Sequence, residues 1–158
     1  MHHPLSKRLQ KRQKIVEEIV ASERLYYKFL AIMTERFLLP LKSILTPTQI
    51  EAIFSNIEQI APFHKIIAYE LEQNPAVSKV FLKYVSYLKL YQPYVNNYER
   101  ALKTISDLKS EKQFQKVIMA IILADADATQ QACFLLLMIL HVSFWLKSEE
   151  MSLVEVSI

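Results

Sequence analysis

Apolar residues follow the 3.6-residue period of an α-helix along most of the chain. In residues 5–39 this period places the apolar side chains on one face and a narrow charged strip on another. Glu23 falls in the middle of the apolar face. A buried, unpaired carboxylate is costly and tends to be paired or neutralised, so Glu23 has a partner within the fold, faces a partner molecule, or breaks the rule without purpose. The apolar face comprises Val16, Ile19, Val20, Tyr26, Tyr27, Leu30 and Phe37.

Proline and capping signals divide the first half of the chain. A first helix is predicted over residues 5–39, with an end or a kink at Pro40 because proline interrupts helical hydrogen bonding. Thr46 is followed by Pro47 at the first helical position and by Gln49 three residues after the cap. This spacing predicts a capping box and the start of a second helix.

A second capping signal introduces the next helix. Ser55 and Glu58 have the spacing of a capping box, which predicts a helix that runs to about residue 73. One side of this helix is apolar, and Pro62 predicts a kink within it. The dipeptide Asn-Pro at 74–75 then predicts a break. The apolar side contains Ile57, Ile60, Phe63, Ile67 and Leu71.

A tyrosine-rich helix is predicted over residues 76–108, interrupted or bent at Pro93, with a short polar joint at 109–112. Five of its tyrosines alternate at spacings of three and four residues. Such a row could stack nucleic-acid bases, but it is more typical of a packed helix face with its hydroxyls at the rim. We therefore expect a structural seam and no nucleic-acid partner. The row is Tyr84, Tyr87, Tyr91, Tyr94 and Tyr98.

Composition supports an all-α fold and excludes several classes of enzyme. The chain has no glycine among its 158 residues, although average usage of about 7% predicts roughly eleven. Nucleotide-binding loops and the nucleophile elbow of hydrolases all require glycine, so these sites are excluded. No nucleophile and base can be paired by sequence spacing. The single cysteine, Cys133, permits no internal disulfide and favours a reducing compartment.

Metal ligation is not predicted. The four histidines, at positions 2, 3, 64 and 141, match no zinc-site spacing. Residues 125–129, Asp-Ala-Asp-Ala-Thr, resemble the start of a calcium loop but lack the glycine that its turn requires. We interpret them as a joint between helices.

Charge is unevenly distributed. Residues 1–116 hold 18 basic and 11 acidic side chains, a net +7, and residues 117–158 hold 1 and 5, a net −4. Residues 7–14 alone contain five basic side chains. This cluster could contact an anionic membrane, but a solvated first turn of a helix is the favoured interpretation.

The last part of the chain is strongly apolar, with 23 apolar residues among the 30 at positions 117–146. Its longest apolar run, residues 132–146, is 15 residues long, whereas a membrane-spanning helix needs about 20. Asp125 and Asp127 would also be expensive in hydrocarbon. We predict that this run packs as a substitute core helix and does not cross a bilayer.

Residues 22–30, SERLYYKFL, resemble the opening motif of the Dbl-homology domain, Thr-Glu-x-x-Tyr-Val-x-x-Leu. Ser22 replaces the threonine, and Glu23, Tyr26 and Leu30 match. The Dbl-homology domain is the exchange-factor domain for Rho-family small GTPases. Further blocks of similarity follow in the family's order at residues 37–41, 53–72, 80–105 and 114–118, so the resemblance covers about residues 15–118.

The resemblance implies an elongated all-α bundle of the Dbl-homology type and a guanine-nucleotide exchange factor for Rho-family GTPases. In this family the glutamate of the first helix contacts the first switch of the GTPase. Glu23, with Ser22 and Tyr26 beside it, is therefore the candidate GTPase-binding set. The family needs no cofactor and no small-molecule substrate, and it acts on its partner without covalent chemistry, as a regulator rather than an enzyme. We expect a cytoplasmic location, with peripheral contact at membranes left open.

The sequence departs from the family after Ile118. The family's third block, Lys-Pro-x-Gln-Arg-Ile-x-Arg-Tyr, is not found, and about half of the expected GTPase surface is missing with it. We therefore divide the chain into a truncated Dbl-homology region, 1–118, and a divergent apolar tail, 119–158. Two alternatives stay open: a helical interaction module without exchange activity, and a small protein anchored in a membrane by residues 132–146.

Overall fold

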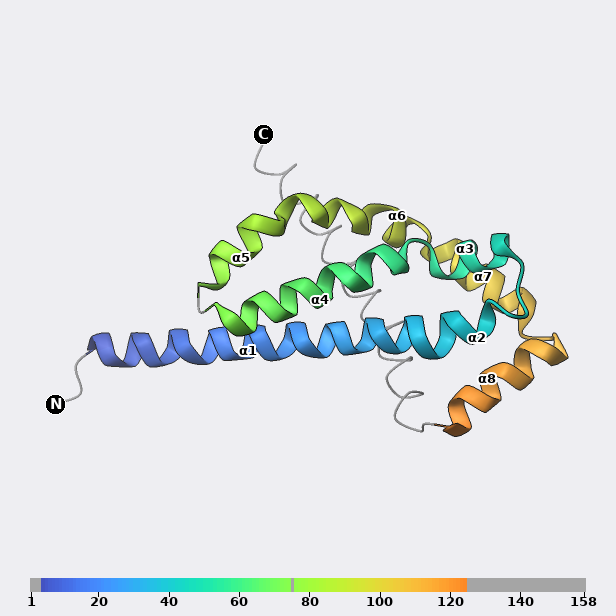
Figure 1. Ribbon diagram of the computed structural model, residues 1–158, viewed down its shortest axis with the longest axis horizontal. Helices are drawn as coiled ribbons and strands as arrows, with labels where there is room; N and C mark the ends of the chain where they lie inside the picture. The colour runs from blue at the N-terminus through green and yellow to red at the C-terminus, as the bar shows by residue number, and fades with distance from the viewer. Residues whose placement is uncertain (1–3, 75, 125–158) are drawn as a thin grey trace, which may run out of the picture.

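A computed structural model describes residues 4–74 and 76–124. All the regular elements in these residues are helices, and α1 (Pro4–Ile32) runs along most of the length of the molecule (Figure 1). The predicted all-α class and the elongated bundle are therefore confirmed. The predictions for the apolar tail, residues 132–146, and for the joint at 125–129 lie outside the described residues.

The first helix ends close to the predicted position, after a change of hydrogen-bond register. A π-helical segment, Met33–Leu38, follows α1 and leads into the short α2 (Leu39–Leu41). The amide of Leu39 donates to the carbonyl of Thr34, five residues back. This wide turn immediately precedes Pro40, which has no amide hydrogen to donate in the ordinary register. The helix then ends at Leu41, next to Pro40, in agreement with the prediction.

One of the two predicted capping boxes is confirmed and the other is wrong. At α3 (Pro47–Phe54) the Thr46 hydroxyl accepts from the Gln49 amide, and the Gln49 side chain accepts from the Thr46 amide at 2.9 Å. Ser55, in contrast, closes α3 with a φ of +46°, so its side chain does not cap the next helix. Positive φ in a residue other than glycine is strained, and here it provides the tight turn that a glycine-free chain must still make.

Helix α4 (Ile57–Gln73) packs lengthwise against α1 (Figure 1). The helix contains Pro62 and ends at Asn74, in agreement with the predicted break. Its predicted apolar side is buried throughout, from Ile57 to Leu71. The α1–α4 contact is thus the central packing of the bundle, and it brings the apolar face of α1, where Glu23 lies, against the apolar face of α4.

The tyrosine-rich region is broken into four pieces rather than bent once. It forms α5 (Val77–Tyr84), a 3-10 helix (Val85–Leu90), α6 (Tyr91–Asn96) and α7 (Tyr98–Leu108). Asn56 fixes the end of the 3-10 helix because its amide donates to the Leu90 carbonyl at 2.8 Å. The tyrosine row is packed as predicted at four positions, and Tyr87 is half exposed. The prediction of hydroxyls at the rim is wrong for Tyr91, whose hydroxyl is bonded inside the bundle.

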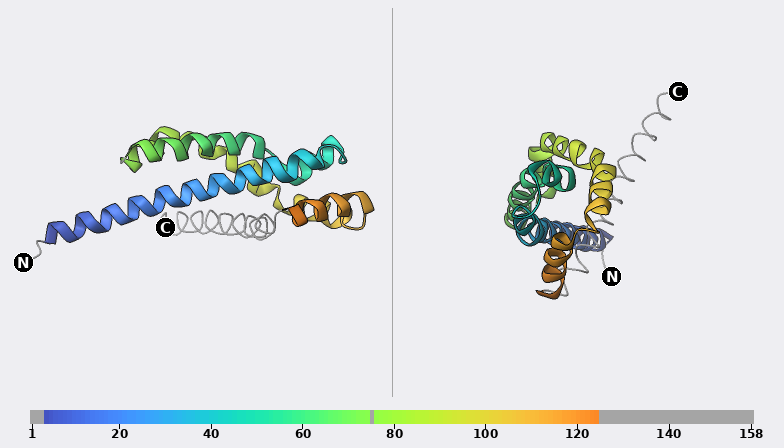
Figure 2. Two further views of the ribbon diagram at one scale, coloured as in Figure 1. Left: turned by 60° about the horizontal axis from the view of Figure 1, so that its bottom comes forward. Right: turned by 90° about the vertical axis from the view of Figure 1, so that its right-hand side faces the viewer.

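Helix α8 (Lys112–Ala124) follows the predicted polar joint and lies across the end of the bundle near α2 (Figure 1). Figure 2 shows that the first turns of α1 project past the ends of α4 and α5. The basic side chains at 7–14 are exposed there, and the anionic-membrane contact stays a prediction. None of the helices in the described residues is both long enough and apolar enough to cross a bilayer.

Candidate functional site

The carboxylate of Glu23 has a partner inside the fold. Its Oε1 atom is hydrogen-bonded to Nδ1 of His64, which α4 presents to α1. The side chains are only 12% exposed for Glu23 and 8% exposed for His64. Among the three explanations that the sequence left open for Glu23, the structure thus supplies a partner within the chain.

His64 is also bonded on its other side. Its Nε2 atom lies 2.5 Å from the hydroxyl of Tyr91, the first residue of α6, and this hydroxyl donates to the hydroxyl of Tyr26 at 2.8 Å. Glu23, His64, Tyr91 and Tyr26 therefore form a continuous polar chain, which begins and ends on α1 and passes through α4 and α6. We call these four residues the polar chain.

Hydrogen-bond chemistry sets the role of one ring nitrogen of His64. A carboxylate can only accept a hydrogen bond, so Nδ1 of His64 donates to Glu23. This bond offsets part of the cost of burying the Glu23 side chain between α1 and α4.

Aromatic rings enclose the polar chain. The His64 ring lies edge-on to Tyr26, Phe63 and Tyr91, at centroid distances of 4.7, 5.0 and 5.6 Å. Burial is the main cause that raises the pKa of Tyr26 to about 12. It also raises the pKa of Tyr91 and of nearby Tyr94 well above the ordinary phenol value. These phenols accordingly stay neutral hydrogen-bonding groups at physiological pH.

The three residues predicted to bind a GTPase are placed differently from one another. Glu23 and Tyr26 belong to the polar chain, whereas Ser22 is exposed and its hydroxyl donates to the Ile19 carbonyl at 2.9 Å within the helix. Sequence reasoning missed the roles of His64 and Tyr91. A usable signal existed, because His64 is a polar residue on the otherwise apolar side of α4, as Glu23 is on α1.

An exposed ion pair also joins α1 to α4. Arg24, which follows Glu23, lies 2.7 Å from Glu72, and the two side chains are 67% and 32% exposed. The described residues contain no group of three or more His, Cys, Asp or Glu side chains placed to hold a metal ion.

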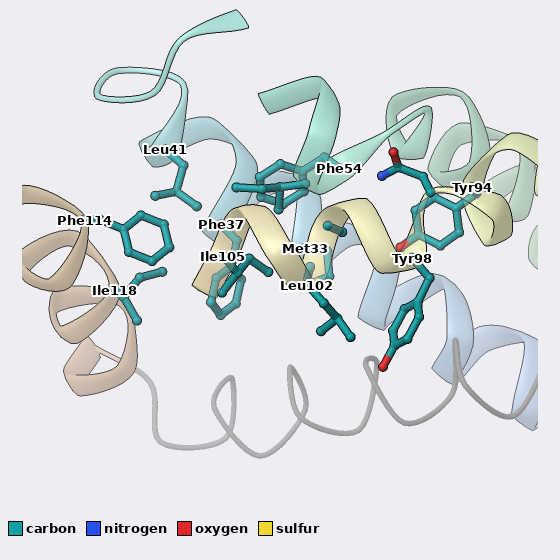
Figure 3. A pocket seen from close by; sticks show the side chains of 13 residues that line it. Met33, Phe37, Leu41, Phe54, Tyr94, Tyr98, Leu102, Ile105, Phe114 and Ile118 are labelled. Atoms are coloured by element: carbon teal, nitrogen blue, oxygen red, sulfur yellow. The ribbon is translucent and has the colours of Figure 1, made fainter. Parts of the chain in front are cut away.

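Next to the polar chain lies an apolar groove of about 230 Å³ (Figure 3). It is bounded by the end of the first helix, by α7 and by α8, and Figure 3 shows side chains from all three turned toward it. None of the residues that line it carries a charge. Tyr94 connects the two features. It lines the groove, and it lies close enough to Tyr26 that the interaction between the two phenols helps to raise the pKa of Tyr94. The lining residues are Met33, Phe37, Leu41, Ile53, Phe54, Tyr94, Asn97, Tyr98, Ala101, Leu102, Ile105, Phe114 and Ile118.

Comparisons with known proteins agree on one family for this chain. The model of the RhoGEF domain matches residues 15–139, which extends beyond the residues that carry the sequence motifs. Two relatives in Dictyostelium discoideum are the guanine exchange factor for Rac 30, 30% identical over 70% of this chain, and the kinase and exchange factor for Rac B, 32% identical over 82% of it. The chain spans only 7% and 13% of the lengths of these two relatives.

Solved structures agree with this assignment. A structure of the Vav1 exchange factor superimposes with a TM-score of 0.67 and 26% sequence identity. The match covers 72% of this chain and 33% of the Vav1 chain. A second, activated truncation of Vav1 gives the same TM-score at 28% identity.

Proposed function

Because the chain belongs to the RhoGEF domain family, we propose that it binds a Rho-family small GTPase and promotes guanine-nucleotide exchange on it. The observation that carries this proposal is the family match over residues 15–139, together with the bundle that the chain forms. Exchange of this kind needs no bond to be made or broken in the protein. It requires that the factor binds the nucleotide-free GTPase more tightly than the nucleotide-bound form.

We assign the contact with the GTPase to Glu23, supported by Ser22 and Tyr26. The bond to His64 is made by Oε1 and restricts the orientation of the Glu23 side chain. Ser22 is exposed next to it on the surface of α1. A carboxylate held in one orientation loses less conformational freedom on binding than a free one, which favours association. The polar chain would thus serve to orient Glu23 as well as to stabilise the bundle.

The test is a nucleotide-release assay with a Rho-family GTPase such as Rac, loaded with a fluorescent guanine nucleotide. The protein should accelerate release, and Glu23→Gln should reduce this acceleration about tenfold or more, because the charge is lost while the side-chain shape is kept. Glu18→Gln is the matched control, since Glu18 is an exposed carboxylate on the same helix. The Glu18→Gln variant should accelerate nucleotide release from the GTPase as much as the unaltered protein does.

Three results are informative. Equal rates for the two variants, with both folded, would show that Glu23 is not the contact. Binding of the nucleotide-free GTPase without accelerated release would favour the interaction-module alternative. Neither binding nor release by the unaltered protein would contradict the proposed function itself.

A further inference from the structure

The apolar groove is an unusual surface for the described part of the chain to leave open. Leu102 on α7 lines it and is 42% exposed. Apolar surface in water is unfavourable, and an apolar groove is a place where another segment or protein can pack. The candidate occupants are a segment of this chain, a second copy of it and another protein.

The path of the chain points to the occupant. Helix α8 contributes Phe114 and Ile118 to the groove and ends at Ala124, so the chain leaves the described region beside the groove. Ile118 and Ala124 are six residues apart in a helix, which corresponds to about 9 Å. Seven extended residues, 125–131, can reach about 23 Å. The chain that follows them can therefore return to the groove.

The composition of that chain matches the lining. Residues 128–146 contain no Asp, Glu, Lys or Arg, and residues 132–146 are the longest apolar run in the sequence. The groove also lacks charged lining residues. The two carboxylates of the intervening segment, Asp125 and Asp127, lie before the apolar run and need not enter the groove. Residues 132–146 therefore bring no Asp, Glu, Lys or Arg to the groove, and His141 and Ser143 are their polar side chains.

We propose that residues 132–146 of the same chain occupy this groove against α7 and α8. A tethered segment is present at a local concentration in the millimolar range, so it competes effectively with a second copy or an unrelated protein. The groove adjoins Tyr94 and, through it, the polar chain.

The sequence provides native probes for this proposal, because the single tryptophan, Trp145, and the single cysteine, Cys133, both lie in the proposed segment. In the full-length protein at low concentration, Trp145 emission should be blue-shifted relative to the urea-unfolded chain. Cys133 should react slowly with a thiol reagent. Both signals report the surroundings of the segment directly and require no label.

A pair of matched variants locates the contact. Leu102→Asp places a charge in the groove, and it should shift Trp145 emission to the red and raise the reactivity of Cys133 about tenfold. Leu82→Asp is the control, because Leu82 is 72% exposed on α5 and does not line the groove. It should change neither signal. Leu102→Gln, an uncharged variant, should act in the same direction and more weakly, and circular dichroism checks that each variant is folded.

Several outcomes would overturn the proposal. Trp145 emission in the unaltered protein equal to that of the unfolded chain would show that the segment is not covered. Identical responses to Leu102→Asp and Leu82→Asp would place it elsewhere. A blue shift that appears only at concentrations where light scattering detects a dimer would assign the groove to a second copy. A shift that requires phospholipid vesicles would assign the segment to a membrane.

Discussion

The polar chain and the apolar groove adjoin one another but differ in how completely the described residues cover them. The polar chain has partners from α1, α4 and α6 for each of its bonded groups. The groove is open along α7 and α8. An unpaired buried charge costs several kcal/mol, so a partner for Glu23 had to be provided within the bundle. Apolar exposure costs only about 25 cal/mol per Å², so the described residues can leave a groove open without a prohibitive loss of stability.

The largest expected effect is the loss of one member of the polar chain. Glu23→Ala would leave His64 without its partner in a buried site, which typically costs ~3–5 kcal/mol of the free energy of unfolding. Urea denaturation of the two proteins measures the difference. The exposed Arg24–Glu72 pair, which joins the same two helices, supplies the control, and Glu72→Ala should cost about 1 kcal/mol or less.

The pattern of these two values also tests the GTPase assignment. A Glu23→Ala change within about 0.5 kcal/mol of the parent would mean that water satisfies the carboxylate, as for a surface residue. In that case the structural role described above for Glu23 would be wrong. A destabilised but folded Glu23→Ala protein that also loses GTPase binding would show that Glu23 performs both roles.

The second expected effect is alkaline loss of stability. The pKa of Tyr26 is raised to about 12 in the folded protein, above the value near 10 in the unfolded chain, so the neutral phenol is stabilised by folding. Its contribution is fully present below about pH 10 and is lost as the pH rises through about 12. Two pKa units correspond to about 3 kcal/mol.

Thermal unfolding between pH 9 and pH 12 measures this loss. Tyr26→Phe should be less stable at neutral pH but should show a shallower decline above pH 10. Tyr69→Phe is the control, because the Tyr69 ring is exposed, and its alkaline decline should equal that of the parent. A Tyr26→Phe curve parallel to that of the parent would argue against burial of the phenol.

The smallest expected effect is the loss of a single tyrosine hydroxyl, which can be measured both in the polar chain and in the groove. Tyr91→Phe removes the group between His64 and Tyr26 and leaves Nε2 without its partner, at an expected cost of about 1–2 kcal/mol. Tyr98→Phe, on the wall of the groove, should change stability by about 0.5 kcal/mol or less. Equal costs in urea denaturation would mean that the polar chain is no better ordered than the groove.

Local sequence signals predicted much of the fold. The capping box at Thr46 formed because its hydrogen bonds join residues three apart, and the apolar side of α4 was buried because its period is set by the helix itself. The same kind of signal failed at Ser55. There Ser55 closes α3 with a positive φ, so it lies in the turn between α3 and α4, and Asn56 takes the N-cap position of α4.

The sequence by itself determined that this protein is an all-α chain of the RhoGEF family and that Glu23 required an explanation. Only the tertiary structure decided which side chains provide it. His64 is 41 residues from Glu23, and Tyr91 is 65 residues from Tyr26. Helical periodicity specifies the face on which each residue lies, but it contains no information about which faces meet. That choice depends on the packing of α4 and α6 against α1, where burial makes each polar group require a partner.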